Sequence, residues 1–209
     1  YNLVERFRGL GIPCDAVHLD HHYMERKEGF TWDKQNFPDA EGMVRSLEKD
    51  GVKTVLIVNP GVKVNPANPV WKEGMERNYF CRRSEGNLLS EEVWPGLCNF
   101  PDFTAPAVRG WWADLFSRDI GKIGVRGLWN DMNEPAMFCT PEGVAELKEY
   151  IKDNFMDKEE APGFTLGDKV NALANNPEDY RRFYHNVDGR KIRHDKVHNL
   201  FGYNMTRAA

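Results

Sequence analysis

Helix-like and strand-like patterns alternate along this chain, and this order constrains the fold more than any single motif does. Three short apolar runs have the length and β-branched content of buried strands, at residues 15–19, 53–58 and 125–129. Amphipathic patterns typical of helices come before or after these runs, at 4–10, 40–49, 106–120, 142–155, 168–175 and 196–207. Strands that alternate with helices indicate βα units, so we predict an α/β fold built on a parallel sheet.

Two long insertions interrupt the alternation. The first, at about 59–104, follows the second strand and contains a short helical pattern at 71–76 and a predicted hairpin that turns at Glu85-Gly86-Asn87. The second, 140–195, is charged, and we predict that it is helical. A long connection after a parallel strand is more often functional than idle, so the first insertion is expected to contribute to a site.

Composition excludes several classes of function. The net charge of −4 argues against a nucleic-acid partner, which requires a basic surface. No apolar stretch approaches the roughly 20 residues that a membrane span needs. The cysteines are scattered without a C-x-x-C pair, so a zinc site is not expected, and reduced thiols favour a cytoplasmic location. They stand at Cys14, Cys81, Cys98 and Cys139.

A polar cluster follows the third strand directly. It contains two carboxylates, Asp131 and Glu134, in the run 127–135. In α/β enzymes the carboxyl ends of parallel strands hold the chemistry, so these carboxylates are candidate catalytic groups. The competing interpretation is that Asp131 only caps the helix that follows, as Asp and Asn often do.

A histidine-rich segment at the end of the first strand could be mistaken for a metal site. It contains His18, Asp20, His21 and His22. If the strand continued through them, His18 and His22 would lie on one face and His21 on the other, so their ligand atoms would not converge. We therefore predict no metal site at this segment.

The run from Trp129 to Glu134 resembles the W-x-D-M-N-E nucleophile motif of glycoside hydrolase family 31, the retaining α-glucosidases and α-xylosidases. Four further segments resemble family motifs in the same order, at 19–24, 59–61, 93–96 and 198–208. Residues 140–209 are most similar to gut-bacterial α-glucosidases of the family, which favours a bacterial source. Three strands do not close a (β/α)8 barrel, which takes eight strands and about 250 residues. The whole chain, 1–209, is thus expected to be a segment of the catalytic barrel, about its second to fourth βα units.

The resemblance implies that Asp131 is the nucleophile and that Glu134 supports it by hydrogen bonding. It also implies that Asp20 accepts hydrogen bonds from sugar hydroxyls. Retaining glycosidases use two carboxyl groups roughly 5–5.5 Å apart, and no cofactor. The expected reaction is hydrolysis of terminal α-linked glucose from oligosaccharides.

The resemblance further implies a sugar pocket walled by Trp94 and Trp129 and lined by Met132. Without the motif, either Trp could equally be a core residue. Two positions depart from the family pattern: His21 replaces an aliphatic residue beside Asp20, which puts the linkage preference in doubt, and Asn59 replaces an Asp.

No segment after Asp131 resembles the family's acid/base motif. General acid catalysis typically contributes ~10²–10⁴ in rate, so these residues alone are expected to hydrolyse ordinary glycosides negligibly. Two alternatives stay open: a non-catalytic carbohydrate-binding fragment, and an α-xylosidase or transglycosylase of the same family. The oligomeric state of the whole protein is also open.

Overall fold

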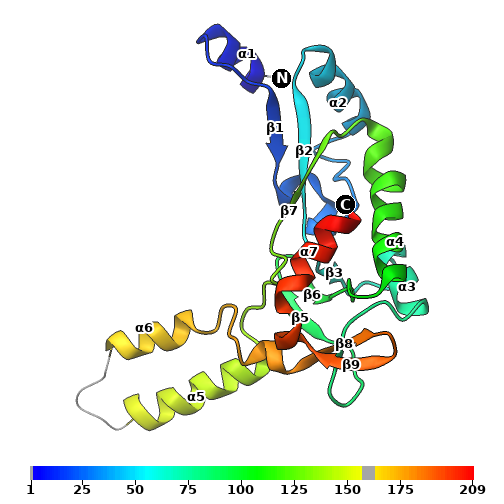
Figure 1. Cartoon of the computed structure of the whole chain (residues 1–209). Helices are drawn as coiled ribbons and strands as arrows, with labels where there is room; N and C mark the ends of the chain where they lie inside the picture. Colours follow the sequence, from blue (N-terminus) through cyan, green and yellow to red (C-terminus); the bar gives the residue numbers. More distant parts are fainter. Residues whose placement is uncertain (1, 157–162) are drawn as a thin grey trace.

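The centre of the molecule is a three-stranded parallel sheet with strand order β1-β2-β7 (Figure 1). The computed structural model describes residues 2–156 and 163–209. Ala16 pairs with Lys53, and Val55 pairs with Gly127, both in parallel register. The strands are β1 (Ala16–Leu19), β2 (Lys53–Val58) and β7 (Gly127–Asn130). The predicted parallel sheet is confirmed, and the described residues form part of a barrel rather than a closed one.

Helices precede or follow each strand as expected: α1 (Asn2–Gly9), α2 (Ala40–Lys49) and α4 (Pro106–Leu115). The Asp39 carboxylate caps α2 by accepting a hydrogen bond from the Gly42 N–H at 2.8 Å. Pro106 opens α4, at the position where its missing N–H costs nothing. The helix then widens into a π turn over Phe116–Ile120, so its regular part is shorter than the predicted 106–120.

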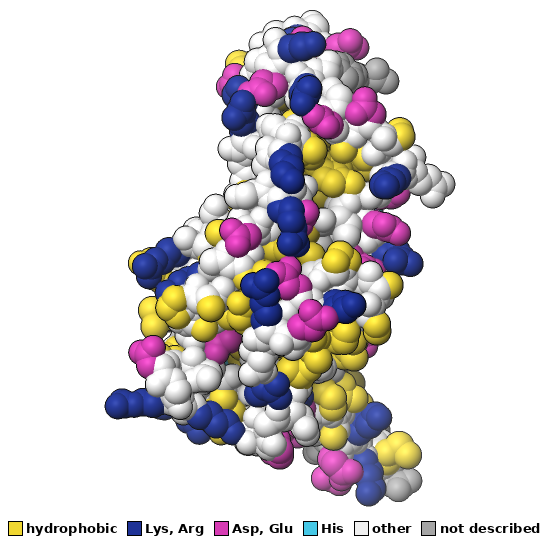
Figure 2. All heavy atoms as spheres, turned by 90° about the vertical axis from the view of Figure 1, so that its right-hand side faces the viewer, with side chains coloured by type: hydrophobic (Ala, Val, Ile, Leu, Met, Phe, Trp, Pro, Cys, Tyr) yellow, Lys and Arg dark blue, Asp and Glu magenta, His cyan; other side chains and the backbone are white. Residues whose placement is uncertain are grey.

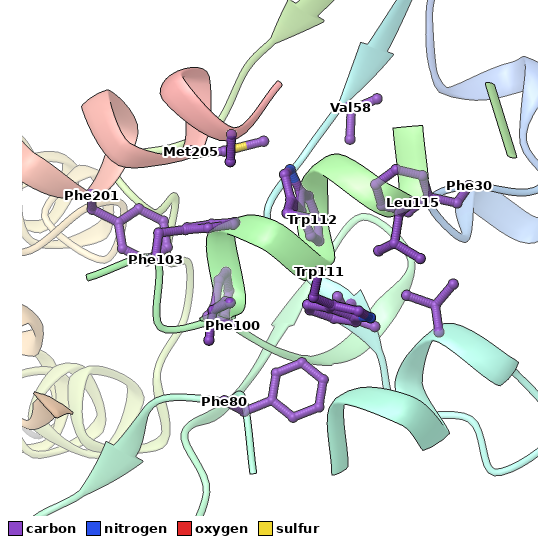
Figure 3. Packing of buried hydrophobic residues seen from close by; sticks show 14 of the residues in the cluster. Phe30, Val58, Phe80, Phe100, Phe103, Trp111, Trp112, Leu115, Phe201 and Met205 are labelled. Atoms are coloured by element: carbon purple, nitrogen blue, oxygen red, sulfur yellow. The ribbon is translucent and has the colours of Figure 1, made fainter. Parts of the chain in front are cut away.

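The main core lies between α4 and the last helix, α7 (His198–Ala208) (Figure 3). Trp112 is fully buried at its centre. Its ring centroid is 4.9 Å from that of Phe30 and 5.1 Å from that of Phe103, both in edge-to-face geometry. Phe201 and Met205 bring α7 against this cluster. The aromatic core therefore joins the barrel helix α4 to the segment that follows the strand-end loop of β7.

The first insertion contains more strand than the sequence indicated. Its elements are β3 (Val62–Lys63), α3 (Pro69–Glu76), β4 (Arg82–Arg83), β5 (Ser90–Val93) and β6 (Gly96–Asn99). The predicted turn at Glu85-Gly86-Asn87 is present, with Gly86 at φ 93° and a bridge between Arg82 and Leu88. A second hairpin, β5–β6, was not predicted, and it turns through Trp94 and Pro95.

The second insertion is only partly helical. α5 (Pro141–Phe155) follows the prediction, and α6 (Gly163–Asn171) begins and ends earlier than the predicted 168–175. These two helices form an arm that projects from the body (Figure 1). The expectation that all of 140–195 is helical was wrong, because β8 (Phe183–Val187) and β9 (Arg190–Arg193) form a hairpin. Its turn, Asp188-Gly189, has positive φ at both residues, which is the backbone that a tight hairpin favours.

The two insertions meet at the end of the sheet where the strands terminate. β4 pairs with β8 in antiparallel register, so the first insertion is hydrogen-bonded to the second. Figure 1 shows the β5–β6 and β8–β9 hairpins beyond the carboxyl ends of β1, β2 and β7. The face that carries α2 and α4 presents Lys, Arg, Asp and Glu side chains mixed with hydrophobic ones (Figure 2). Within the described residues, no helix combines the length and apolarity that crossing a bilayer requires.

Candidate active site at the strand ends

Three polar side chains stand at the carboxyl ends of the three neighbouring strands. Asp20 follows β1, Asn59 follows β2 and Asp131 follows β7. The ladder between β2 and β7 continues one step further, because the Asp131 N–H donates to the Val58 carbonyl at 3.3 Å. The sheet thus places these three residues along one edge, as the sequence predicted.

His21 joins two of these residues. Its Nδ1 lies 2.8 Å from Asp20 Oδ1, and its Nε2 lies 2.5 Å from Asn59 Nδ2. His21 and Asn59, the two departures from the family pattern, are thus in direct contact.

Trp94 reaches the strand ends from the β5–β6 hairpin. Its ring is stacked on His21 with centroids 5.7 Å apart and an interplanar angle of 11°. Phe138 packs edge-on against it at 5.1 Å. Phe138 could not be predicted from the sequence, since an isolated Phe in a loop has no distinguishing pattern.

A small pocket joins the hairpin to the loop after β7. Its lining is Asn59, Pro60, Gly61, Val93, Trp94, Pro95, Phe100, Met132 and Ala136. Met132 has φ 56°, a left-handed conformation that is uncommon outside glycine, and the turn brings its side chain to this pocket. At Gly61, a Cβ atom would come within 3.2 Å of Val93 and 3.3 Å of Cys98, so the hairpin approaches the β2 end closely.

Trp129 lies apart from Trp94. Successive side chains of β7 point to opposite faces of the sheet. Leu128 and Asn130 line a groove beside α4, together with Phe116. Trp129, between them in the sequence, therefore lies on the opposite face. On that face Trp129 meets His18 of β1 edge-on, with centroids 6.2 Å apart. The structure therefore brings Asp20, His21, Trp94 and Met132 around the strand ends, with Trp129 on the strand itself.

Glu134 lies on the outer side of the same loop. It is exposed, and within the described residues its carboxylate makes no hydrogen bond or ion pair. Burial raises the pKa of the Tyr180 phenol to about 12, and the negative charge of Glu134 adds to this rise. The charge of Glu134 thus acts on Tyr180, which precedes β8, and Glu134 is not among the residues that line the small pocket.

A family model described as the glycosyl hydrolases family 31 TIM-barrel domain matches residues 1–209. The chain belongs to glycosyl hydrolase family 31. Alpha-glucosidase 2 of Bacillus thermoamyloliquefaciens is 42% identical over 138 residues, which cover 65% of this chain and 17% of that protein. An alpha-glucosidase of Saccharolobus solfataricus is 31% identical over 199 residues, 95% of this chain and 26% of that protein. This family 31 chain therefore spans about a sixth to a quarter of these relatives.

Solved family 31 structures share the fold. A crystal structure of the glucosidase II alpha subunit superimposes with a TM-score of 0.74 at 28% identity, over 99% of this chain and 19% of that one. A family 31 alpha-xylosidase from a soil metagenome superimposes with a TM-score of 0.69 at 15% identity, over 99% of this chain and 24% of that one. The latter similarity concerns the fold alone.

The histidine-rich segment of this family 31 chain does not continue strand β1, so the predicted alternation of His18, His21 and His22 between two faces is absent. β1 ends at Leu19, and His21–Tyr23 form a 3-10 turn whose first N–H is accepted by Asp20 at 2.6 Å. Across the described residues, the metal-ligating side chains that converge lie elsewhere, in a buried group of Cys81, Asp102 and His185. Sequence spacing could not reveal this group, because its members stand 21 and 83 positions apart in the chain.

Proposed function

We propose that the protein is a retaining α-glucosidase in which Asp131 is the nucleophile. The observation that carries this proposal is the position of Asp131 at the carboxyl end of β7, beside the ends of β2 and β1. The relatives that bear the name alpha-glucosidase support the choice of sugar. The proposed reaction releases terminal α-linked glucose from oligosaccharides.

In the proposed first step the ionised Asp131 carboxylate attacks the anomeric carbon of the bound sugar. A bond forms between that carbon and an Asp131 oxygen as the glycosidic bond breaks, and a second carboxyl group gives its proton to the leaving oxygen. Water then hydrolyses the glycosyl-enzyme. The second carboxyl group belongs to a part of the protein outside these 209 residues.

The surrounding residues bind and orient the sugar in this proposal. Asp20 accepts hydrogen bonds from sugar hydroxyls, because its side chain is largely exposed at the strand end. The paired rings of His21 and Trp94 form one apolar wall, and Met132 lines the adjoining pocket. Trp129 limits the site from the β7 side. Glu134 has a supporting role through its negative charge on the loop that carries Asp131, because its carboxylate makes no hydrogen bond within the described residues.

The test is covalent trapping in the whole protein that contains this chain. We would incubate it with 5-fluoro-α-glucosyl fluoride and identify the labelled peptide by mass spectrometry. A glucosyl adduct on the peptide that carries Asp131 is expected, and Asp131→Asn should remove it. An adduct on another carboxylate would overturn the nucleophile assignment. Faster labelling by the corresponding α-xylosyl fluoride would overturn the choice of glucose while keeping the nucleophile.

A further inference from the structure

Cys81, Asp102 and His185 converge in the interior, away from the strand-end site. They come from three segments: Cys81 directly precedes β4, Asp102 lies just before α4, and His185 is in β8. All three are buried, and their ligand atoms lie within 4.8 Å of one another. His185 Nδ1 is 2.7 Å from Asp102 Oδ1 and 3.6 Å from Cys81 Sγ.

We propose that these three side chains bind a tetrahedral divalent cation of the zinc type. Bond lengths of about 2.3 Å to sulfur and 2.0–2.2 Å to nitrogen and oxygen require ligand atoms roughly 3.3–3.6 Å apart. The Cys81–His185 separation already meets this requirement. The Asp102–His185 hydrogen bond would have to lengthen by roughly 0.6 Å, which is within the reach of a side-chain rotation.

The fourth coordination position and the entry path are provided by a cavity of about 430 Å³. Asp102 and His185 line its inner wall, so water could complete the coordination from that side. Four cationic side chains line this cavity, and each is engaged within the described residues. Arg77 pairs with Glu73, and Arg83 pairs with Glu91 and Glu142. Arg82 donates to Asn78 and Gly86, and Lys191 donates to the Ser84 carbonyl. Among the described residues that line this cavity, Asp102 is the only buried carboxylate.

The residues behind the ligands form the supporting hydrogen bonds that metal sites require. Asp102 is held by the Thr104 hydroxyl at 2.5 Å and by the Asn186 N–H at 2.7 Å. His185 Nε2 is 2.9 Å from His194 Nδ1, and His194 Nε2 is 3.0 Å from His198 Nδ1. A His185 ring bound through Nδ1 would therefore donate its remaining N–H to His194.

Proton balance is simple along this row of imidazoles. Burial raises the pKa of the Cys81 thiol, so without a cation it stays protonated, and on binding it releases one proton. His185 loses its Nδ1 proton to solvent. The proton on His194 Nδ1 moves to His185 Nε2, and the proton on His198 Nδ1 moves to His194 Nε2. His198 then takes one proton from solvent. The three rings together keep the same number of protons, and the cation gains one thiolate and one carboxylate.

A cation at this place would cross-link both insertions to the barrel. It would hold the segment before β4, the segment before α4 and strand β8 at one point. The β4–β8 pairing already joins the two insertions, but two paired residues per strand are a weak connection. The inferred site is thus a structural metal site, distinct from the proposed catalytic residues.

The test uses cobalt(II) as a spectroscopic probe of the whole protein, kept reduced and freed of metal with a chelator. Cys14→Ser and Cys139→Ser together form the background, because these are the more accessible thiols of the chain. We expect one equivalent of cobalt to produce thiolate-to-metal charge-transfer absorption in the near ultraviolet. Zinc should displace it and raise the thermal midpoint of the protein.

The deciding variant is Cys81→Val, which keeps an apolar side chain of similar size. It should abolish the charge-transfer absorption and weaken cobalt binding at least tenfold, while circular dichroism shows a folded protein. Cys98→Val is the matched control, since Cys98 is equally buried but has no His or Asp beside it in the described structure. Absorption that survives Cys81→Val, or no absorption in a folded protein with a titratable Cys81 thiol, would overturn the proposal.

Discussion

The imidazole of His21 lies nearly parallel to the indole of Trp94, with 5.7 Å between the ring centroids. This contact fastens the tip of the β5–β6 hairpin to the end of β1, although the two residues are 73 positions apart. The same imidazole is hydrogen-bonded to Asp20 and Asn59. A single side chain therefore sets the position of the aromatic wall and of the carboxylate next to it.

Removing the indole ring of Trp94 should impair the reaction more than the fold. We expect Trp94→Ala to lower kcat/KM of the whole protein about tenfold or more, since ring stacking and sugar contact are lost together. Trp94→Phe keeps a ring on His21 and should stay within a few-fold of the parent. Steady-state kinetics on maltose would check both, and equal losses for the two variants would contradict a role for stacking.

Asp131→Asn should reduce turnover by on the order of 10⁴ or more, because the nucleophile is lost while the loop keeps its shape. The circular dichroism spectrum and the thermal midpoint should remain close to the parent values. Glu134→Gln is the matched comparison, with an expected loss of at most tenfold, because Glu134 is exposed and does not line the small pocket. A more severe loss for Glu134→Gln than for Asp131→Asn would exchange their proposed roles.

Gly202 tests how α7 holds the strand-end loop. A Cβ atom at this position would lie 2.9 Å from the Asn133 carbonyl oxygen, so Gly202→Ala must push the loop or the helix aside. We expect a loss of about 1–3 kcal/mol in the free energy of unfolding, together with a lower kcat.

Gly110→Ala on α4 is the control for Gly202→Ala. It meets nothing within 4 Å and should stabilise by roughly 0.5–1 kcal/mol through helix propensity. Urea denaturation of both variants would check the opposite signs. Stabilisation by Gly202→Ala would mean that α7 does not restrain the loop.

Glu91 should make stability depend on pH. Burial raises the pKa of its carboxyl group from 4.5 to about 7, against the opposing effect of Arg83, and the carboxylates of Glu142 and Asp179 add to the rise. Between these two pH values the folded state binds a proton that the unfolded state has lost. Stability should therefore fall as pH rises from about 4.5 to about 7, by on the order of 1 kcal/mol or more.

The measurement for Glu91 is the urea midpoint as a function of pH. Glu91→Gln should flatten the profile in this window, because no proton is exchanged at that position. Glu92→Gln, its exposed neighbour on the same strand, should leave the slope unchanged. A slope that persists in Glu91→Gln would assign the pH dependence to other groups.

The parallel sheet could be predicted because its strands are short apolar runs with clear boundaries. The segment 53–58 and helix 40–49 were predicted to the residue, since Asp39 caps the helix and β-branched residues fill the strand. The β8–β9 hairpin was missed although Asp188-Gly189 is a strong turn signal. Charged residues around it matched a helical pattern, and its stability comes from pairing with β4, which is distant in sequence.

The site was predictable only in part. Motif resemblance and strand ends made Asp131 and Asp20 candidates, and both lie at strand ends in the structure, but nothing local indicates that Trp94 is stacked on His21 or that Phe138 packs against it. Those contacts depend on the β5–β6 hairpin, whose short strands contain two adjacent Glu residues and a Ser. The buried group around His185 depends on tertiary structure in the same way.

The insertion between β2 and β7 adds little to the entropy cost of closing the sheet. Partners in β1 and β2 are 37 residues apart, from Ala16 to Lys53, whereas those in β2 and β7 are 72 apart, from Val55 to Gly127. Loop-closure entropy grows with the logarithm of length, so this near doubling costs only about 0.6 kcal/mol. A barrel can therefore acquire or exchange such a hairpin, and with it the aromatic wall of its pocket, while the probability that its strands find one another falls only about threefold.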